Sequence, residues 1–329
     1  MLRTLRRLSY FLPALALAVI VLGAYVRLSD AGLGCPDWPG CYGRLTVPSG
    51  VADVHLQHPD WRRRPLETGK AWREMIHRYL ASTLGLGVVI LAAASARPSL
   101  RRAVGTSSVV YLLVPLVTFQ GLLGMWTVTL LLKPLVVSAH LLGGLATLGL
   151  LWWNLLTVRG QPVFAVPAGG LFLWARVAVL VLILQIFLGG WTSANYAALA
   201  CTDFPTCQGR WWPHSNFREA YVLWRGLGIN YEFGVLDTRA RTAIHLGHRL
   251  GALLASLTVG LTALLAWRTG KPRLCRLASC ILAALALQVG LGITNVLGGL
   301  PLPVAVAHNG VAAVLLLTLI TLVHSTRRL

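Results

Sequence analysis

Four histidines lie in apolar stretches at repeat-equivalent places in the chain: His77, His140, His248 and His308. Ionisable side chains in such stretches are costly and usually mark a functional site. A single histidine there most often serves packing through a hydrogen bond. Two histidines in each half, on two different helices of that half, instead favour ligands for a bound cofactor.

The number of ligands narrows the choice of cofactor. A structural zinc site needs four nitrogen or sulfur ligands close together, whereas each half offers two histidines and the cysteines lie in loops. Two histidines on opposite helices of a four-helix bundle suit axial ligation of a heme iron, because the bundle can enclose the apolar macrocycle. We therefore expect one heme-sized site in each half.

A carboxylate distinguishes the two expected sites. Glu74 lies three residues before His77, so helical spacing puts both on one face. The equivalent residue in the second half is His245. Glu74 is either an interfacial acid paired with Arg73 or Arg78, or a carboxylate that handles protons or stabilises positive charge beside a bound substrate.

Arginines follow two of the expected ligands directly. Arg78 comes after His77 and Arg249 after His248. Each is a candidate for an ion pair with a heme propionate, and each could equally anchor its helix to lipid headgroups. The sequence leaves these alternatives open.

Cysteine pairs flank two short loops of equal length, Cys35–Cys41 and Cys201–Cys207. On the outer side of a bacterial plasma membrane both pairs would meet an oxidising compartment and form disulfides. A structural role is favoured for both, and a redox-active Cys35–Cys41 bridge remains the alternative. Cys275 and Cys280 lie at the inner end of a helix, where we expect free thiols.

The composition sets the framework for these residues. Hydrophobic residues make up 56% of the 329 and charged residues only 12%, which excludes a soluble protein and indicates an integral membrane protein. The net charge of +19 does not indicate nucleic-acid binding, because the basic residues flank apolar runs. All ten acids fall in two windows, residues 30–74 and 203–237.

Eight apolar runs are long enough to cross a bilayer, and each must be helical to satisfy its own backbone there. They are Leu8–Leu28, Met75–Ala96, Val104–Val128, Leu135–Val158, Val177–Ala194, Ala243–Trp267, Leu277–Val296 and Pro303–Val323. The inner connections carry arginines and no acid if both termini are cytoplasmic, which the positive-inside rule favours. The long loops then lie outside. The first run is too long for a typical signal peptide.

An internal repeat organises these helices. At an offset of 166, the first loop and its Cys35–Cys41 pair match the second loop with Cys201–Cys207. The prediction is an all-α membrane protein of two tandem, pseudo-symmetric four-helix bundles, residues 1–160 and 161–329. Since four helices separate the copies, both bundles share one orientation in the membrane.

Five segments carry a resemblance to heme A synthases, and together they span most of the chain. They are GAYVRLSDAGLGCPDWPGCYG at Gly23–Gly43, EMIHRY at Glu74–Tyr79, AHLLGG at Ala139–Gly144, HLGHRLGA at His245–Ala252 and AHNG at Ala307–Gly310. The first segment, with its cysteine pair, is the most specific of the five.

The resemblance implies oxidation of the C8 methyl group of heme O to a formyl group, giving heme A for terminal oxidases. It also implies a permanent heme b on His248 and His308, and a substrate heme on His77 and His140 with Glu74 as the catalytic carboxylate. Delivery of heme O by heme O synthase or by diffusion, and the electron acceptor, stay open. A di-heme b-type electron-transfer protein is the alternative function, and a heme exporter or chaperone is a third.

Overall fold

The computed structural model describes residues 2–50, 54, 65–164 and 170–327. Within these ranges the chain is helical, without strands, and eight helices are long and apolar enough to cross a membrane. They are α1 (Leu2–Leu28), α3 (Thr68–Ser95), α5 (Val110–Thr129), α6 (Pro134–Val158), α7 (Leu171–Ala194), α9 (Thr238–Trp267), α10 (Pro272–Leu297) and α11 (Leu302–Thr326). The prediction of an all-helical membrane protein with eight spans is thereby confirmed.

Two helices begin earlier than their apolar runs predicted. The helix containing His77 begins at Thr68 rather than Met75, and the helix containing His248 begins at Thr238 rather than Ala243. Asp237 caps the latter by accepting a hydrogen bond from the Ala240 amide at 2.7 Å. Hydropathy misses these first turns because their side chains are polar although their backbone is helical.

The predicted start of the third run was wrong. A short helix, α4 (Pro98–Val104), ends where that run was expected to begin. Gly105 follows with φ +74, a left-handed conformation that ends a helix and favours glycine. The span itself, α5, begins only at Val110. One further short helix, α8 (Phe217–Ala220), lies in the long loop before α9.

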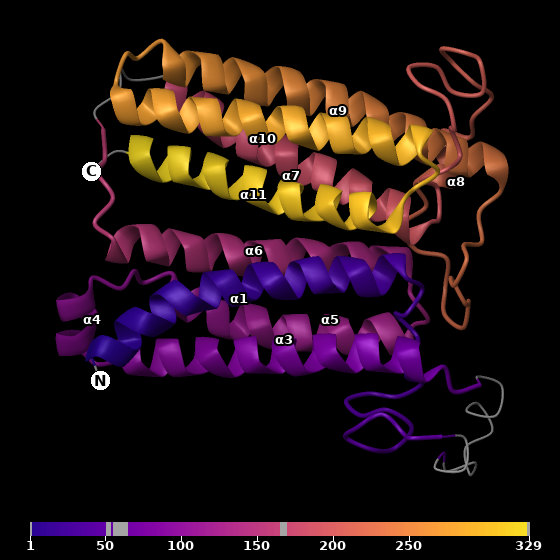
Figure 1. Cartoon of the computed structure of the whole chain (residues 1–329), viewed down its shortest axis with the longest axis horizontal. Helices are drawn as coiled ribbons and strands as arrows, with labels where there is room; N and C mark the ends of the chain where they lie inside the picture. Colours follow the sequence, from indigo (N-terminus) through magenta and orange to yellow (C-terminus); the bar gives the residue numbers. More distant parts are fainter. Residues whose placement is uncertain (1, 51–53, 55–64, 165–169, 328–329) are drawn as a thin grey trace.

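The eight long helices pack in two groups of four (Figure 1). In the first group, α1 contacts α3, α3 contacts α5, α5 contacts α6, and α6 contacts α1. The second group repeats this ring with α7, α9, α10 and α11. In each ring the two helices that carry the predicted histidine ligands are therefore not neighbours but lie across from one another. Both chain termini lie at the same end of the helices (Figure 1).

The groups meet through α1 and α6 on one side and α7 and α11 on the other. Glycines allow close approach there: Gly190 of α7 faces Leu141, and Gly149 of α6 faces Ile320. Buried leucines such as Leu148 and Leu319 belong to one core that continues across both groups. The molecule therefore has one shared core rather than two separate ones.

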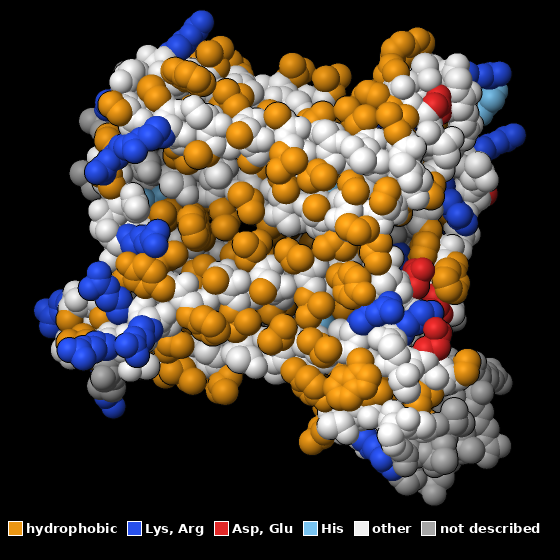
Figure 2. Space-filling view, viewed as in Figure 1, with side chains coloured by type: hydrophobic (Ala, Val, Ile, Leu, Met, Phe, Trp, Pro, Cys, Tyr) orange, Lys and Arg blue, Asp and Glu red, His pale blue; other side chains and the backbone are white. Residues whose placement is uncertain are grey.

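Apolar side chains also cover the outside of the helices (Figure 2). Leu86, Leu112, Leu180 and Leu257 are between 59% and 65% exposed. In this view lysines and arginines lie at both ends of the helices, whereas acidic side chains appear at the end away from the termini (Figure 2). An apolar belt between polar ends is the surface that a lipid bilayer requires.

Candidate functional site

The four histidines occupy equivalent positions in the two rings. His77 lies on α3 and His140 on α6, whereas His248 lies on α9 and His308 on α11. Within each ring the two histidines lie on helices that face one another across the ring. The structure thus brings together the pairs that the repeat predicted, with one pair in each group.

A glycine on a neighbouring helix faces each imidazole. A Cβ atom at Gly23 would lie 2.9 Å from Cε1 of His77, and one at Gly189 would lie 3.2 Å from Cε1 of His248. Gly124 faces His140 at 3.5 Å and Gly292 faces His308 at 3.2 Å in the same way. A side chain at Gly23 would therefore clash with the ring, and one at Gly189 or Gly292 would be tight, whereas the distance at Gly124 is an ordinary contact.

Three of the four imidazoles have a buried ring nitrogen without a hydrogen-bond partner. Nδ1 of His77, of His140 and of His308 is buried and has no hydrogen-bond partner. Among the residues that the structure describes, no group of three or more His, Cys, Asp or Glu side chains is placed to hold a metal ion. Two nitrogens per site fit a metal that brings its own equatorial ligands, as heme iron does, and they do not fit a structural zinc ion.

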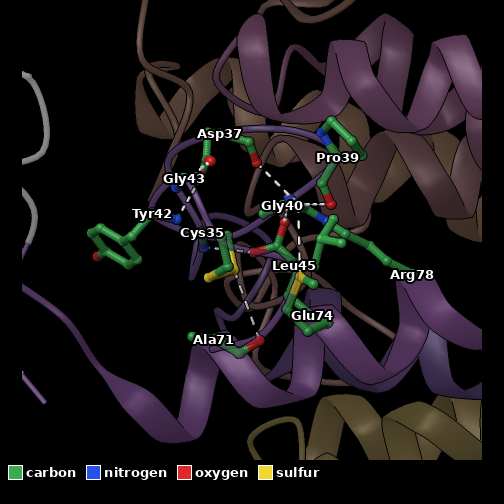
Figure 3. Close-up of a disulfide and its surroundings, with 12 residues drawn as sticks. Cys35, Asp37, Pro39, Gly40, Tyr42, Gly43, Leu45, Ala71, Glu74 and Arg78 are labelled. Atoms are coloured by element: carbon green, nitrogen blue, oxygen red, sulfur yellow. Dashed lines mark hydrogen bonds and ion pairs between the residues drawn. A yellow bond between two sulfur atoms is a disulfide. The ribbon is translucent and has the colours of Figure 1, made fainter. Parts of the chain in front are cut away.

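Both cysteine pairs are bonded as disulfides in the structure, and both close the same kind of loop. In the first loop the carboxylate of Asp37 accepts hydrogen bonds from the amides of Tyr42 and Gly43 at 2.6 and 2.8 Å. Asp203 does the same for Gln208 and Gly209 at 2.6 and 3.0 Å. Figure 3 shows the first of these loops.

The pKa of Asp203 is lowered to about 2, chiefly by a hydrogen bond from the Thr206 hydroxyl and then by the amides of Gly209 and Gln208. Because hydrogen bonds to a carboxylate favour its charged form, this loop keeps its internal acceptor at any physiological pH.

The two remaining cysteines, Cys275 and Cys280, are free thiols.

Arg78 and Arg249 hold these loops on their helices. Arg78 donates to the backbone oxygens of Asp37, Pro39 and Gly40 at 3.0, 3.2 and 2.5 Å (Figure 3). Arg249 donates to three carbonyl oxygens at 2.7 to 3.1 Å, those of Cys201, Asp203 and Thr206. The guanidinium groups thus bind loop carbonyls in both halves, and a contact with a heme propionate stays a prediction.

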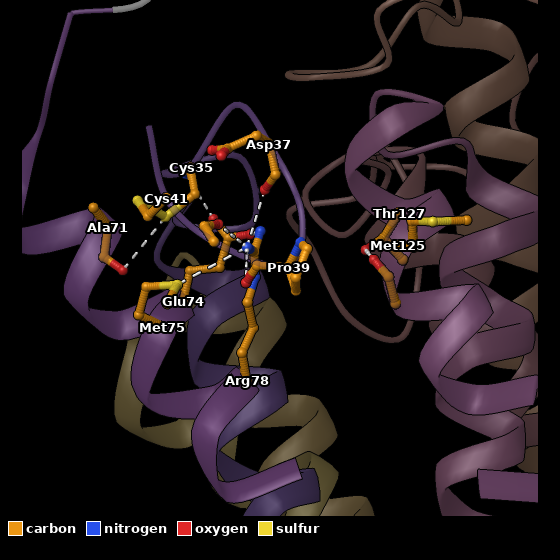
Figure 4. Close-up of polar contacts among 12 residues, drawn as sticks. Cys35, Asp37, Pro39, Cys41, Ala71, Glu74, Met75, Arg78, Met125 and Thr127 are labelled. Atoms are coloured by element: carbon orange, nitrogen blue, oxygen red, sulfur yellow. Dashed lines mark hydrogen bonds and ion pairs between the residues drawn. A yellow bond between two sulfur atoms is a disulfide. The ribbon is translucent and has the colours of Figure 1, made fainter. Parts of the chain in front are cut away.

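The carboxylate of Glu74 lies directly beneath the first disulfide loop (Figure 4). Oε2 accepts a hydrogen bond from the Cys35 amide at 2.9 Å, and Oε1 pairs with Arg78 at 2.5 Å. The residue is only 5% exposed. An interfacial acid in water is therefore not what the structure contains, although the expected pairing with Arg78 is present.

His245 takes the same place in the second half. Its Nδ1 accepts a hydrogen bond from the Cys201 amide at 3.2 Å, as Glu74 does from Cys35. It is 4% exposed. Arg249 lies one turn further along α9 and, among the described residues, forms no ion pair with a carboxylate there. The two halves thus share a scaffold and differ in one buried negative charge.

Two features of the site were not predicted from the sequence. The glycines that face the imidazoles recur at the repeat spacing, so they carried a signal that could have been used. Gln185 contacts the ring of His248 through its side-chain amide at 3.1 Å, and the matching residue in the first half is Val19. No motif in the sequence marks that contact.

The chain matches a known protein family over most of its length. The model of COX15-CtaA, described as a cytochrome oxidase assembly protein, matches residues 6–320. The chain belongs to this family. The match covers all four histidines, Glu74 and both disulfide loops.

Curated relatives of this family cover nearly the whole chain. A protein of Shewanella oneidensis named heme A synthase is 47% identical over 314 residues, which cover 93% of this chain and 92% of that protein. Heme A synthases of Paracoccus denitrificans and Caulobacter vibrioides are 29% and 27% identical. The first alignment covers 92% of this chain and 82% of the relative, and the second covers 93% and 91%.

Proposed function

We propose that this protein is a heme A synthase, an enzyme of the bacterial membrane that oxidises a methyl group of heme O to the formyl group of heme A. The observation that carries this proposal is the 47% identity over almost the full length to a heme A synthase. The paired histidines and the buried carboxylate beside one pair support the same chemistry.

The proposal assigns different tasks to two tandem, pseudo-symmetric four-helix bundles, residues 1–160 and 161–329. His77 and His140 hold the iron of the substrate heme in the first bundle. Glu74 is the catalytic carboxylate for oxidation of the C8 methyl group of that heme. His248 and His308 hold a permanent heme b in the second. The support for this division is the single negative charge of Glu74, which the second half lacks.

The orientation is also part of the proposal. Both termini are cytoplasmic, and both disulfide loops lie on the outer side of the plasma membrane. The support is charge, since arginines without acids flank the helices at the end that holds the termini. Both loop disulfides are assigned a structural role, because each loop is also held by an arginine and an internal carboxylate.

The chemistry of a methyl-to-formyl conversion explains the buried carboxylate. The methyl carbon gains an oxygen, for which water is the source, and the protons and electrons released in this oxidation must leave the site. Heme b, bound by His248 and His308, would supply one-electron transfer. Glu74 accepts a proton or offsets positive charge near the reacting methyl group. Arg78 and the Cys35 amide each bond one carboxylate oxygen and so fix its position.

The partners follow from this assignment. The substrate is heme O, which reaches the first bundle by diffusion in the membrane or by transfer from heme O synthase. An electron acceptor is required to balance the oxidation. Nothing in the charge distribution supports a nucleic-acid partner, because the basic residues lie at helix ends.

Pigment extraction tests the proposal. The protein is expressed in membranes that contain heme O, and the extracted hemes are separated and identified. A heme A synthase yields heme A, and its yield falls to background with Glu74→Ala. A di-heme electron-transfer protein instead yields heme b alone, with or without that substitution, and this result would overturn the proposal.

A further inference from the structure

We infer that Gln185 is a positioning residue for His248, and that it sets the redox potential and the retention of the heme in the second half. This inference rests on the proposed function in one respect, namely that His248 is an axial ligand of a heme b. It concerns a side chain that belongs to neither the ligand set nor the repeat motifs.

The inference begins with a pattern shared by all four histidines. The residue four positions before the facing glycine is Val19 for His77, Gln120 for His140 and Gln288 for His308. The fourth member of this pattern is Gln185, four positions before Gly189. Its side-chain amide contacts Nδ1 of His248 at 3.1 Å, whereas the amide of Gln288 contacts the other ring nitrogen, Nε2, of His308 at 3.2 Å.

The contact of Gln185 is part-buried and involves both the ring and the backbone of His248. Its amide nitrogen lies 3.1 Å from Nδ1 of His248 and 3.1 Å from the backbone oxygen of the same residue. Room for the amide comes from Gly251, where a Cβ atom would lie 2.3 Å from Oε1 of Gln185. The residue that matches Gly251 in the first half is Leu80, beside Val19. The first half therefore has neither the amide nor the space for it.

An unpartnered atom indicates how the amide acts when iron is bound. Oε1 of Gln185 is buried and has no hydrogen-bond partner. A neutral imidazole that binds iron through Nε2 carries its proton on Nδ1. Rotation of the amide then lets Oε1 accept that proton in a hydrogen bond, which satisfies the unpartnered oxygen.

Such a hydrogen bond makes the imidazole a stronger donor and fixes the orientation of its ring. A stronger donor stabilises ferric over ferrous iron, so the midpoint potential falls and the heme is held more tightly. His77 has no side-chain partner of this kind, and its Nδ1 is unpartnered. The difference suits a permanent heme in one half and a substrate that must leave in the other.

The experiment compares Gln185→Leu with Gln185→Glu in the purified, heme-loaded protein. Leucine removes the acceptor, and outer-shell changes of this kind alter metal affinity about tenfold or more. A tenfold change in the preference for ferric iron corresponds to about 59 mV for one electron. We expect Gln185→Leu to raise the potential by about that amount and to speed heme transfer to apomyoglobin about tenfold. Gln185→Glu keeps acceptor oxygens and should not raise the potential.

Gly251→Ala provides a second test that leaves Gln185 in place. The added methyl group displaces the amide, so the potential should shift in the same direction as with leucine. Gln120→Leu, in the other half, is the matched control and should leave the heme b potential unchanged.

The outcomes separate the two proposals. A wild-type protein without a low-spin b-type heme contradicts the proposed heme b site itself. A wild-type protein with that heme, but with the same potential and heme release in Gln185→Leu, contradicts only the role of Gln185. Equal shifts with leucine and glutamate would likewise reduce Gln185 to a packing residue.

Discussion

The two disulfide loops and the helices beneath them are built alike, and they differ where Glu74 in one half corresponds to His245 in the other. Both residues accept a hydrogen bond from the first cysteine of their loop. Both loops are also held by an arginine that follows the histidine ligand. The hydrogen-bond role at this position is therefore filled equally well by a neutral imidazole.

This comparison shows what the scaffold does not require. A buried carboxylate is costly even when it is paired, and the second loop folds on its helix without one. The charge of Glu74 thus needs an explanation other than loop folding. Chemistry at the neighbouring histidine pair provides one, and each of the following experiments breaks or sharpens the comparison between the halves.

The largest effect is expected at Glu74. Glu74→Gln keeps the size and hydrogen-bonding capacity but removes the charge and most of the basicity. Heme A formation should fall at least about a hundredfold, the usual minimum for loss of an acid–base group. The heme b spectrum should stay normal, and trapped product should be heme O or a partly oxidised hydroxylated form.

Glu74→His sharpens this test, because it makes the first half resemble the second. The Cys35 amide should keep its partner, so thermal stability should change little while activity is lost. His245→Gln is the matched control and should retain activity. Heme A formation near the wild-type rate in Glu74→Gln would contradict a catalytic role and leave Glu74 with a structural one.

Substitutions in the two histidine pairs should affect different hemes. His248→Ala or His308→Ala should remove heme b from the purified protein, because a bis-histidine site loses an axial ligand. His77→Ala should leave that heme in place and abolish heme A formation. Absorption and electron paramagnetic resonance spectra measure this difference. A full low-spin b-type spectrum in both His248→Ala and His308→Ala would refute the assignment.

A smaller effect is expected from the facing glycines. In Gly189→Ala the new methyl group would lie 3.2 Å from Cε1 of His248, which is tighter than an ordinary contact, so the ring must shift slightly. Heme b should be lost about tenfold faster, because changes in residues that contact a metal ligand weaken metal binding by about that factor. Gly260→Ala on the same helix as His248 meets no atom within 4 Å and serves as the control. Equal heme loss in the two variants would contradict the packing argument.

The smallest effect is expected from the second disulfide. Cys201→Ser with Cys207→Ser should lower the free energy of unfolding by about 2–3 kcal/mol, because the bridge closes a short loop. Heme A formation should persist. Thiol labelling of the unreduced, unfolded protein should detect only Cys275 and Cys280. Labelling of all six cysteines would contradict both disulfides.

Much of the fold could be predicted from hydropathy and the internal repeat. The eight spans were found because each apolar run must satisfy its own backbone in a bilayer. Their ends were less accurate, since hydropathy does not register polar first turns such as Thr68–Arg73. The break at Gly105 was missed although Gly105–Ser108 reads GTSS, a short polar stretch that is typical of a turn, because the run was drawn across it.

The site was predicted in its residues but not in its contacts. Repeat spacing singled out His77, Glu74 and their counterparts, because the repeat compares like positions. The binding of loop carbonyls by Arg78 depends on how the loop folds back over α3, which sequence spacing does not contain. The contact of Gln185 was missed for the same reason, since it joins α7 to α9.

The place of α11 has a consequence for how the protein is made. This helix is the last of the eight in the chain, yet it packs against α1, α6, α7 and α10. Gly310 on α11 faces Val21 of α1 at 3.4 Å, so the end of the chain closes on its beginning. His308 lies on the same helix. A chain that ends before α11 therefore lacks both His308 and the contacts of α11 with α1 and α6, although α6 and α7 can still pack together.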